Sequence, residues 1–352
     1  MKVLLVAPQS SDTVLGRIGG YCKDALISLN YDVKVFDFRK SQYARGHIGS
    51  ILRKGIRKLL PFSPRKIPLV RHKEKNKMNV SLAAMAKEFK PDVLFVLMGE
   101  TIGSETLKQI KRQGTIVVNW FHDSVLARKD FVENISSCYD YFFIIDSLEI
   151  CELVNIKSRQ VMSFPLACYP QVHKKIMLSE SEKKTYGSQV CFVGTIKFQR
   201  KEILTQLVDF DLGIWGYWLE KIPKLKSCYR RKHIYGEEAV KIYNACDIVL
   251  DIPINYGLKH KSFYVTPRVF EVPACGGFLL TAQNSCLSNL YEVGKEIICY
   301  KDADDLTELI NYYLKHPEKR KLIAQKGQDR TLRDHTYEKR LKQIFSVIEQ
   351  NG

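Results

Sequence analysis

The chain has 352 residues, of which 55 are Lys or Arg and 38 are Asp or Glu, so its formal net charge is +17. Hydrophobic residues make up 45% of the sequence and aromatic residues 11%, which excludes a globally disordered chain. The length exceeds what one hydrophobic core usually supports, and it predicts two domains. The positive charge is typical of a protein that meets phosphates, nucleic acid or anionic lipid, and it says nothing about topology.

In the first half, short apolar runs bounded by turn signals alternate with helical patterns, which is the signature of a parallel sheet covered by helices. We predict six strands there, at Lys2–Ala7, Asp32–Phe36, Asp92–Leu97, Thr115–Trp120, Tyr141–Ile145 and Gln160–Phe164. These strands predict one Rossmann-like domain, which we place at residues 1–168.

The alternation restarts after a polar, proline-punctuated stretch from Pro165 to Ser188. We predict further strands at Gln189–Val193, Leu212–Trp215, His233–Tyr235, Asp247–Ile252, Gly277–Thr281 and Glu296–Tyr300, and closing helices at Asp304–Lys315, Pro317–Arg333 and Tyr337–Gln350. A second Rossmann-like domain is therefore expected at residues 169–335, and residues 336–352 form a helix that packs back towards the first domain. The fold class is α/β, with two doubly wound domains facing a central cleft at the carboxyl ends of the strands.

Ten cysteines are spread from Cys22 to Cys299 without a CxxC pair. This spacing favours a reducing, cytoplasmic compartment over a disulfide framework, and it disfavours a metal site. Asp302, Asp304 and Asp305 fit the capping of a helix better than metal binding. The amino-terminal apolar run is too short for a signal peptide, and no apolar stretch approaches the roughly 20 residues that cross a bilayer. We therefore expect a protein that does not span a membrane.

Two glycine-containing segments follow predicted strands. Gly16, Gly19 and Gly20 predict a turn that allows close approach of an anion or a sugar ring, although the spacing is not a dinucleotide fingerprint and a turn without a ligand fits as well. Gly194 and Thr195 end a strand before a helix that carries several cations. This second pattern fits either a diphosphate site or an exposed basic helix face.

The segment from Thr266 to Gly277 carries the most informative pattern. Thr266 and Pro267 predict the N-cap and first position of a helix, and a glycine pair ends it. Arg268 and Glu271 share one face of that helix, so the guanidinium can pair with phosphate while the carboxylate accepts ribose hydroxyls. The alternative is a surface ion pair between the two. Apolar neighbours indicate a largely buried helix, which favours the nucleotide interpretation.

From Val190 to about Tyr337 the chain resembles the carboxyl-terminal half of a GT-B glycosyltransferase, most closely the CgeB-type (spore maturation) family. The matching segments are VCFVGTIKFQRKEIL, FDLGIWGYW, HIYGEEAVKIYNACDIVLDI, TPRVFEVPACGGFLLT and GKEIICYKDADDLTELINYYLKHPEKRKLIAQKGQ. The resemblance implies a metal-independent, hexosyltransferase-like enzyme without a cofactor. Such an enzyme moves a sugar from a nucleotide-activated donor to an acceptor hydroxyl, in cell-surface or spore glycan synthesis.

The resemblance also implies a nucleotide-sugar site in the second domain, with Gly194, Thr195 and Arg200 at the diphosphate, Tyr235 and Gly236 at the base, Arg268 at a phosphate and Glu271 at the ribose. Many retaining members carry another Glu eight residues before the ribose-binding one, where this chain has Phe263. The basic Lys259, His260 and Lys261 precede that position, so this loop is expected to touch phosphate or carboxylate. Retention or inversion therefore stays open.

Residues of the first domain supply candidates for the acceptor side. His122 and Asp123 follow a predicted strand at its cleft-facing end, where either side chain would take the proton from an acceptor hydroxyl in an inverting transfer. Alternatively, Asp123 caps the next helix. Glu100, which follows another strand, and the pair Gly19 and Gly20 are further candidates for contacts with the acceptor.

The positive charge is concentrated in residues 39–77, which hold thirteen Lys or Arg against the single acid Glu74 and so carry +12 of the +17. Residues 48–60 place apolar side chains at helical spacing between the cations Arg53, Lys54, Arg57 and Lys58. This pattern predicts a basic amphipathic helix that brings the enzyme to a glycan or lipid-linked acceptor at the inner face of the plasma membrane. The alternatives are a helix that packs on the domain core, a basic nucleic-acid-binding protein, and a non-catalytic glycan-binding protein of the same fold.

We expect the protein to float with anionic liposomes and to lose that flotation when the four cations of residues 48–60 are changed to Glu. The physical reason is that each cation near an anionic surface contributes about 1 kcal/mol to binding. Vesicles of neutral lipid are the control. Unchanged flotation of the variant would contradict the membrane interpretation, whereas tight, salt-sensitive binding of a DNA duplex would favour the nucleic-acid alternative.

Overall fold

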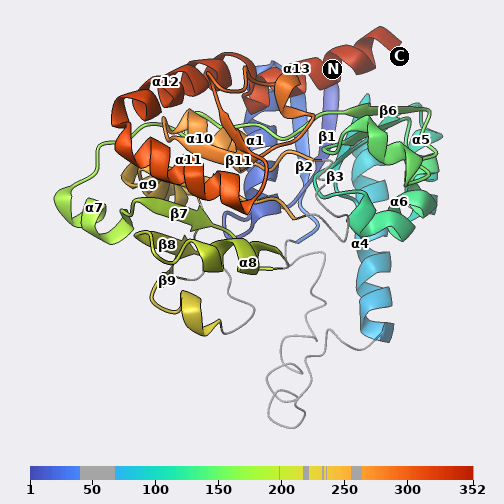
Figure 1. Cartoon of the computed structure of the whole chain (residues 1–352). Coiled ribbons are helices and arrows are strands. Elements are labelled where there is room, and N and C mark those ends of the chain that lie inside the picture. Colours follow the sequence, from blue (N-terminus) through green and yellow to red (C-terminus); the bar gives the residue numbers. More distant parts are fainter. Residues whose placement is uncertain are drawn as a thin grey trace. The chain divides into compact units, whose positions relative to one another are not determined.

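The structure is a computed structural model that describes residues 1–39, 68–197, 199–216, 222–231, 234, 236–254 and 264–351. The chain divides into two compact units (Figure 1). The amino-terminal unit comprises residues 1–144, 148–164 and 344 onwards, and the carboxyl-terminal unit comprises residues 145–147 and 165–343. The predicted amphipathic helix at 48–60 lies outside the described residues. Among the residues that are described, no helix combines the length and the apolar character that a membrane span requires.

The amino-terminal unit is built on a parallel sheet with the strand order β2-β1-β3-β4-β5-β6. Its strands are β1 (Lys2–Val6), β2 (Asp32–Phe36), β3 (Val93–Leu97), β4 (Ile116–Phe121), β5 (Tyr141–Ile144) and β6 (Gln160–Ser163). All six predicted strands are confirmed to within one residue at each end. β3 and β5 are buried at every position, as expected for parallel strands covered on both faces.

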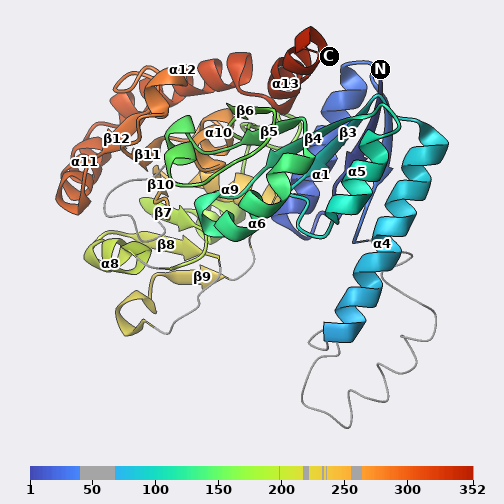
Figure 2. The same ribbon diagram turned by 90° about the vertical axis from the view of Figure 1, so that its right-hand side faces the viewer.

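Helices connect these strands and cover the sheet. They are α1 (Val14–Ser28), α4 (Pro68–Phe89), α5 (Ser104–Lys111) and α6 (Lys129–Ile135), with short 3-10 turns η2 (Leu126–Arg128), η3 (Ser136–Cys138) and η4 (Leu148–Glu152). Because crossovers between parallel strands are right-handed, α1 covers one face while α4 and α5 cover the other. α4 and α5 pack side by side (Figure 2).

The end of the last helix, α13 (Tyr337–Asn351), belongs to the amino-terminal unit. The ring of Phe345 lies 5.5 Å from that of Phe95 and 4.8 Å from that of Tyr31, measured between ring centroids. The Tyr31 hydroxyl also donates to Glu349 at 3.1 Å. Aromatic packing and one hydrogen bond therefore hold the chain's end on this sheet.

The glycine turn predicted after β1 is wrong, because the helix begins earlier. The Thr13 hydroxyl caps α1 by accepting from the amide of Gly16 at 3.1 Å, so Gly16, Gly19 and Gly20 all lie inside the first turns of the helix. A Cβ at Gly19 would lie 2.1 Å from the carbonyl oxygen of Pro8, whereas a Cβ at Gly20 would meet no atom within 4 Å. Gly19 thus lets the helix press on the loop that follows β1.

The carboxyl-terminal unit contains a second parallel sheet, with the order β12-β11-β10-β7-β8-β9. Its strands are β7 (Val190–Val193), β8 (Leu212–Trp215), β9 (Tyr229–Arg231), β10 (Ile248–Asp251), β11 (Leu279–Ala282) and β12 (Ile298–Tyr300). The strand predicted at 233–235 lies outside the described residues except for Ile234, and the edge strand that the structure describes is β9. Edge strands are short and often charged, so the Tyr229–Arg231 segment lacks the apolar run that identifies the others.

Helices of this unit are α7 (Glu180–Tyr186), α8 (Gln199–Gln206), α9 (Glu237–Ala245), α10 (Arg268–Ala274), α11 (Ala303–Lys315) and α12 (Pro317–Asp334), with 3-10 turns η5 (Pro223–Leu225) and η6 (Leu287–Asn289). Side chains of β7 alternate between two cores: Val190 and Phe192 pack with α8 and α11, whereas Cys191 and Val193 pack with α9 and α10. The predicted capping at the start of α11 is confirmed, because Asp302 accepts from the amides of Asp304 and Asp305.

We predict opposite effects of two neighbouring substitutions in α1. Gly19→Ala should lower the free energy of unfolding by about 2 kcal/mol, because the new Cβ would overlap the carbonyl oxygen of Pro8. Gly20→Ala should raise it by about 0.5–1 kcal/mol, because alanine favours the helix and no atom stands in its way. Urea unfolding measures both, and equal changes in the two variants would contradict the packing of α1 described above.

Candidate nucleotide-sugar site

The strand order reverses once in each sheet, and ligands of open α/β sheets bind at the carboxyl ends of the strands beside such a reversal. In the amino-terminal unit the reversal lies between β1 and β3, and in the carboxyl-terminal unit it lies between β7 and β10. The predicted Gly194 turn follows β7, and the segment from Thr266 to Glu271 follows β10 along the chain. The topology therefore places both at the same reversal point.

A buried carboxylate organises the end of β10. Asp251 is 1% exposed, and its Oδ1 accepts from the Thr266 hydroxyl at 2.8 Å and from Nε of Arg268 at 2.9 Å. Its Oδ2 accepts from the Thr281 hydroxyl at 3.0 Å. Three donors thereby satisfy a charge that would otherwise be costly to bury. Asp251 thus ties β10 to β11 and to the start of α10.

Arg268 continues this network to the Gly194 turn. Its Nη1 donates to the carbonyl oxygen of Val193 at 2.9 Å, and the guanidinium lies over the ring of Phe192. A Cβ on Gly194 would lie 3.3 Å from Nη1, so a glycine leaves room for this contact. The alternative of a surface ion pair between Arg268 and Glu271 is wrong, because the Arg268 side chain is only 13% exposed and pairs with Asp251.

Two further predictions at this point need correction. Thr266 does not cap α10 with its side chain, since its hydroxyl donates to Asp251 and Pro267 occupies the N-cap position. Arg200 is only 5% exposed, which excludes the exposed basic face for this residue. Its Nε donates to the carbonyl oxygen of Ile252 at 2.6 Å and its Nη1 to that of Thr195 at 2.9 Å. Arg200 therefore fastens the turn after β7 to the end of β10.

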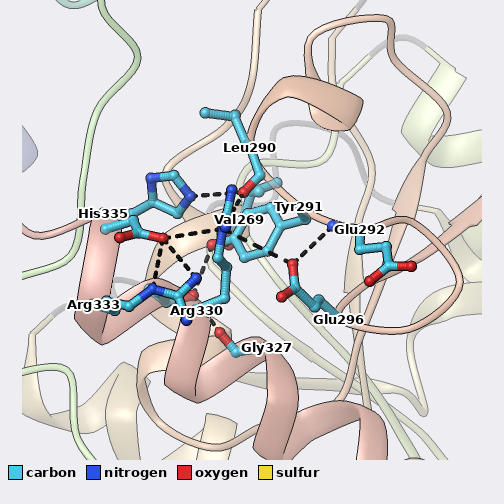
Figure 3. A network of polar contacts seen from close by, with 11 residues as sticks. Val269, Leu290, Tyr291, Glu292, Glu296, Gly327, Arg330, Arg333 and His335 are labelled. Atoms are coloured by element: carbon cyan, nitrogen blue, oxygen red, sulfur yellow. Dashed lines mark hydrogen bonds and ion pairs between the residues drawn. The ribbon is translucent and has the colours of Figure 1, made fainter.

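The far side of α10 is held by contacts with α12 and with Tyr291, which follows η6 (Figure 3). The Tyr291 hydroxyl donates to the carbonyl oxygen of Val269 at 3.0 Å, and Gln328 donates to that of Ala274 at 3.0 Å. The carbonyl oxygen of Leu290 accepts from Arg330 and lies 2.9 Å from Nε2 of His335. The bonds to Val269 and Ala274 keep α10 fixed, and those to Leu290 fasten the segment before Tyr291 to the end of α12. α10 carries both Arg268 and Glu271.

The carboxylate of Glu271 remains partly accessible, with 27% of its side chain exposed. It lies on α10, one turn after Arg268, and Nε2 of the buried His173 is 3.8 Å from its Oε1.

Gly236 precedes α9 with φ of 56°, a conformation that favours glycine. Tyr235, Lys259 and His260, which the sequence also predicted for this site, lie outside the described residues.

In the amino-terminal unit the structure brings three predicted acceptor-side residues together, and it adds a fourth. Nε of Arg128, in η2, lies 3.3 Å from Glu100 and 3.6 Å from Asp123. Asp123 also accepts from the amide of Ser124 at 2.9 Å. His122 directly precedes Asp123 at the end of β4. Sequence reasoning missed Arg128 because no strand or glycine turn marks it.

The turn that carries Glu100 has an unusual backbone. Met98 and Gly99 have φ of 69° and 85°, and the side-chain amide of the buried Asn119 donates to the carbonyl oxygen of Met98 at 3.0 Å. The amide of His122 meets the sulfur of the same Met98 at 3.2 Å. The turn after β3 is therefore fastened to β4, and it holds Glu100 beside the residues that follow β4.

The His122 imidazole is held in an apolar setting. Its ring stands edge-on to Trp120 at 4.4 Å, and among the described residues neither buried ring nitrogen has a hydrogen-bond partner. Burial lowers the pKa of His122 to about 3, because the charged imidazolium would lose its hydration. The ring is therefore neutral at physiological pH, and its buried nitrogens are weak proton acceptors.

The lowered pKa of His122 makes stability depend on pH. Between about pH 3 and pH 6.5 the unfolded chain binds a proton that the folded chain does not, so the free energy of unfolding falls as the pH falls through 6.5. Between pH 7 and pH 5 we expect the parent to lose about 2 kcal/mol more than His122→Phe, which has no titratable ring. Urea unfolding at both pH values measures the difference, and equal losses would show that His122 is not buried as a neutral ring.

The geometry of the described residues contains no group of three or more His, Cys, Asp or Glu side chains placed to hold a metal ion.

Residues 199–346 match the model of a family described as glycosyl transferase-like. The spore protein CgeB of Bacillus subtilis (strain 168) is 22% identical over 285 residues, which span 74% of this chain and 84% of that protein. The resemblance predicted from the sequence is thereby confirmed.

Solved structures give the same result for the fold. Sucrose-phosphate synthase from Thermosynechococcus elongatus is similar with a TM-score of 0.65 and 13% identity, over 99% of this chain and 98% of that one. Anabaena Alr3699/HepE in complex with UDP-glucose is similar with a TM-score of 0.64 and 11% identity, over 99% of this chain and 100% of that one. The chain thus has the GT-B fold of glycosyltransferases, and most of its carboxyl-terminal unit matches the glycosyl transferase-like family.

Proposed function

We propose that the protein transfers a hexose from a uridine diphosphate sugar to an acceptor hydroxyl, and that the carboxyl-terminal unit binds the donor. One observation carries this proposal. Arg268 connects Asp251 to the turn of Gly194 at the point where the strand order reverses. This point lies in the unit that matches the glycosyl transferase-like family. UDP-glucose, the ligand of the similar Anabaena protein, supports the choice of donor class.

The donor site follows from the contacts after β7 and β10. The diphosphate lies at the turn of Gly194 and Thr195, where the absence of a side chain on Gly194 lets it approach the backbone. Arg200 and Arg268 are fixed by carbonyl and carboxylate oxygens, so their positive charge is already in place when charge develops on the leaving diphosphate. This preorganised charge supports transfer without a metal ion or a cofactor.

Glu271 binds the ribose in this proposal. Its carboxylate is partly exposed and lies one helical turn from Arg268, so it can accept hydrogen bonds from two vicinal hydroxyls. The segments that follow β9 and β10, with Tyr235, Lys259 and His260, complete the base and sugar pockets in the same proposal.

The acceptor binds the amino-terminal unit beside Glu100, Asp123 and Arg128. Asp123 is the residue that takes the proton from the attacking hydroxyl, because its side chain is 35% exposed, whereas the ring nitrogens of His122 are buried and burial lowers the pKa of His122 to about 3. That role corresponds to transfer with inversion. The acceptor is a glycan or a lipid-linked sugar at the cytoplasmic face of a membrane, which the basic residues 48–60 contact.

We expect UDP at 100 times its Kd to raise the free energy of unfolding by about 2.7 kcal/mol, because it binds the folded state alone.

Glu271→Gln should weaken UDP binding about tenfold, since the loss of a charged acceptor costs about 1.5 kcal/mol per hydrogen bond. Isothermal titration calorimetry measures the affinity. Glu318→Gln, on the exposed surface of α12, is the matched control and should leave the affinity unchanged. The absence of any thermal shift with uridine, guanosine, adenosine, thymidine and cytidine diphosphates would contradict the proposal.

A further inference from the structure

The loop of residues 168–176 is fastened at both ends to the carboxyl-terminal unit. At its start, the amide of Cys168 donates to the carbonyl oxygen of His335 at 2.9 Å, and the carbonyl oxygen of Cys168 accepts from Tyr337 at 2.9 Å. At its end, Asn244 of α9 accepts from the amide of Ile176 at 3.0 Å. Asn244 also donates to the carbonyl oxygen of Lys174 at 3.2 Å. The loop between these points is therefore held in one place.

His173 lies in the middle of this loop, and the loop fixes the direction of its ring. Its side chain is 6% exposed, and its Nδ1 accepts from the amide of Tyr169 at 3.0 Å. The amide of His173 in turn donates to the carbonyl oxygen of Tyr169 at 2.8 Å. A nitrogen that accepts a hydrogen bond carries no proton in a neutral imidazole, so the ring proton is on Nε2.

The Nε2 proton of His173 faces the site. Nε2 lies 3.8 Å from Oε1 of Glu271, which is longer than a hydrogen bond and close enough for electrostatic attraction. The negative charge of Glu271 therefore interacts with two groups. One is the Nε2 proton of His173, and the other is the guanidinium of Arg268, whose pKa the charge of Glu271 raises. Neither group covers the carboxylate, which remains partly exposed.

The other groups around Glu271 do not compete with His173. Burial raises the pKa values of Tyr243, Cys168 and Cys275, and the charge of Glu271 raises each of them further. These side chains are therefore neutral at physiological pH, and all three belong to the buried core on which α10 packs. Their low polarity strengthens the attraction between Glu271 and the Nε2 proton.

From this geometry we propose that His173 is a positioning residue, which orients the Glu271 carboxylate towards the two ribose hydroxyls of the donor nucleotide. The inference rests on the proposed binding of ribose by Glu271. His173 itself need not touch the ligand. Without its Nε2 donor, the Glu271 side chain has more rotamers to lose on binding, and the affinity for a nucleotide with ribose hydroxyls falls.

Two substitutions test the roles of Nδ1 and Nε2 of His173 separately. His173→Asn keeps an acceptor near the position of Nδ1, so its amide oxygen can still bind the Tyr169 amide and preserve the loop. It removes the donor that faces Glu271. His173→Gln has the opposite effect, because its longer side chain carries an N–H to the position of Nε2. The pair therefore separates support of the loop from orientation of Glu271.

The affinities for UDP and for 2′,3′-dideoxyuridine diphosphate test the proposal by calorimetry on the full chain. We expect His173→Asn to weaken UDP binding about fivefold, to leave binding of the dideoxy ligand unchanged, and to unfold at the same temperature as the parent. His173→Gln should recover most of the UDP affinity. This pattern would establish that His173 acts through the ribose hydroxyls.

Two results would overturn the inference while the proposed function stands. One is unchanged UDP affinity in His173→Asn. The other is an equal loss for UDP and for the dideoxy ligand, which would show that His173 only supports the fold. If the parent binds UDP and the dideoxy ligand equally well, Glu271 does not hold the ribose hydroxyls, and the inference falls together with that part of the proposed function.

Discussion

The buried carboxylate of Asp251 is the constraint on which the candidate donor site depends. A charge in the interior must be fully paired, and Asp251 is paired by Thr266 and Arg268 at the start of α10 and by Thr281 in β11. Its backbone carbonyl oxygen also accepts from the Tyr300 hydroxyl at 3.0 Å. One residue at the end of β10 therefore fixes the start of α10 relative to β11 and β12. Removal of this carboxylate would leave the Arg268 cation buried without its counter-charge.

The two predicted phosphate-binding arginines are largely withdrawn from solvent, Arg200 with 5% and the Arg268 side chain with 13% exposure. Arg200 and Arg268 hold the loops after β7 and β10 by donating to carbonyl oxygens, and they keep their positive charge near the Gly194 turn. Their first role is therefore structural, and any contribution to the diphosphate comes from charge that is fixed in advance. Glu271 differs from both, because its carboxylate is partly exposed.

In the amino-terminal unit an uncharged side chain fastens the turn that follows β3, beside the point where the strand order reverses. Asn119 fastens the turn of Met98 and Gly99 to β4, so that Glu100 is held beside Asp123. Arg128 pairs with both carboxylates, which keeps them together in spite of their like charges. The His122 ring behind them is neutral because it is buried against Trp120. An acceptor hydroxyl would thus meet the partly exposed carboxylates of Glu100 and Asp123 in one small region.

Sequence patterns predicted the strands well where apolar runs were continuous, as in β3, β5 and β7. They failed at β9, whose charged edge segment has no such run, and at α1, whose cap is a single threonine, Thr13, in a stretch that reads as a loop. The burial of Arg268 could not be predicted either, because its partner Asp251 lies seventeen residues earlier in the chain. The apolar neighbours of Arg268 indicated a buried helix, and they were the correct signal.

The central claim is that the loops after β7 and β10 bind the nucleotide. Hydrogen–deuterium exchange of the full chain, with and without saturating UDP, tests it most directly, because exchange reports on individual backbone segments. The account predicts slower exchange in peptides that cover residues 193–197 and 266–275, with little change in peptides that cover α11 or α5. Protection confined to other segments at saturating UDP would contradict the account.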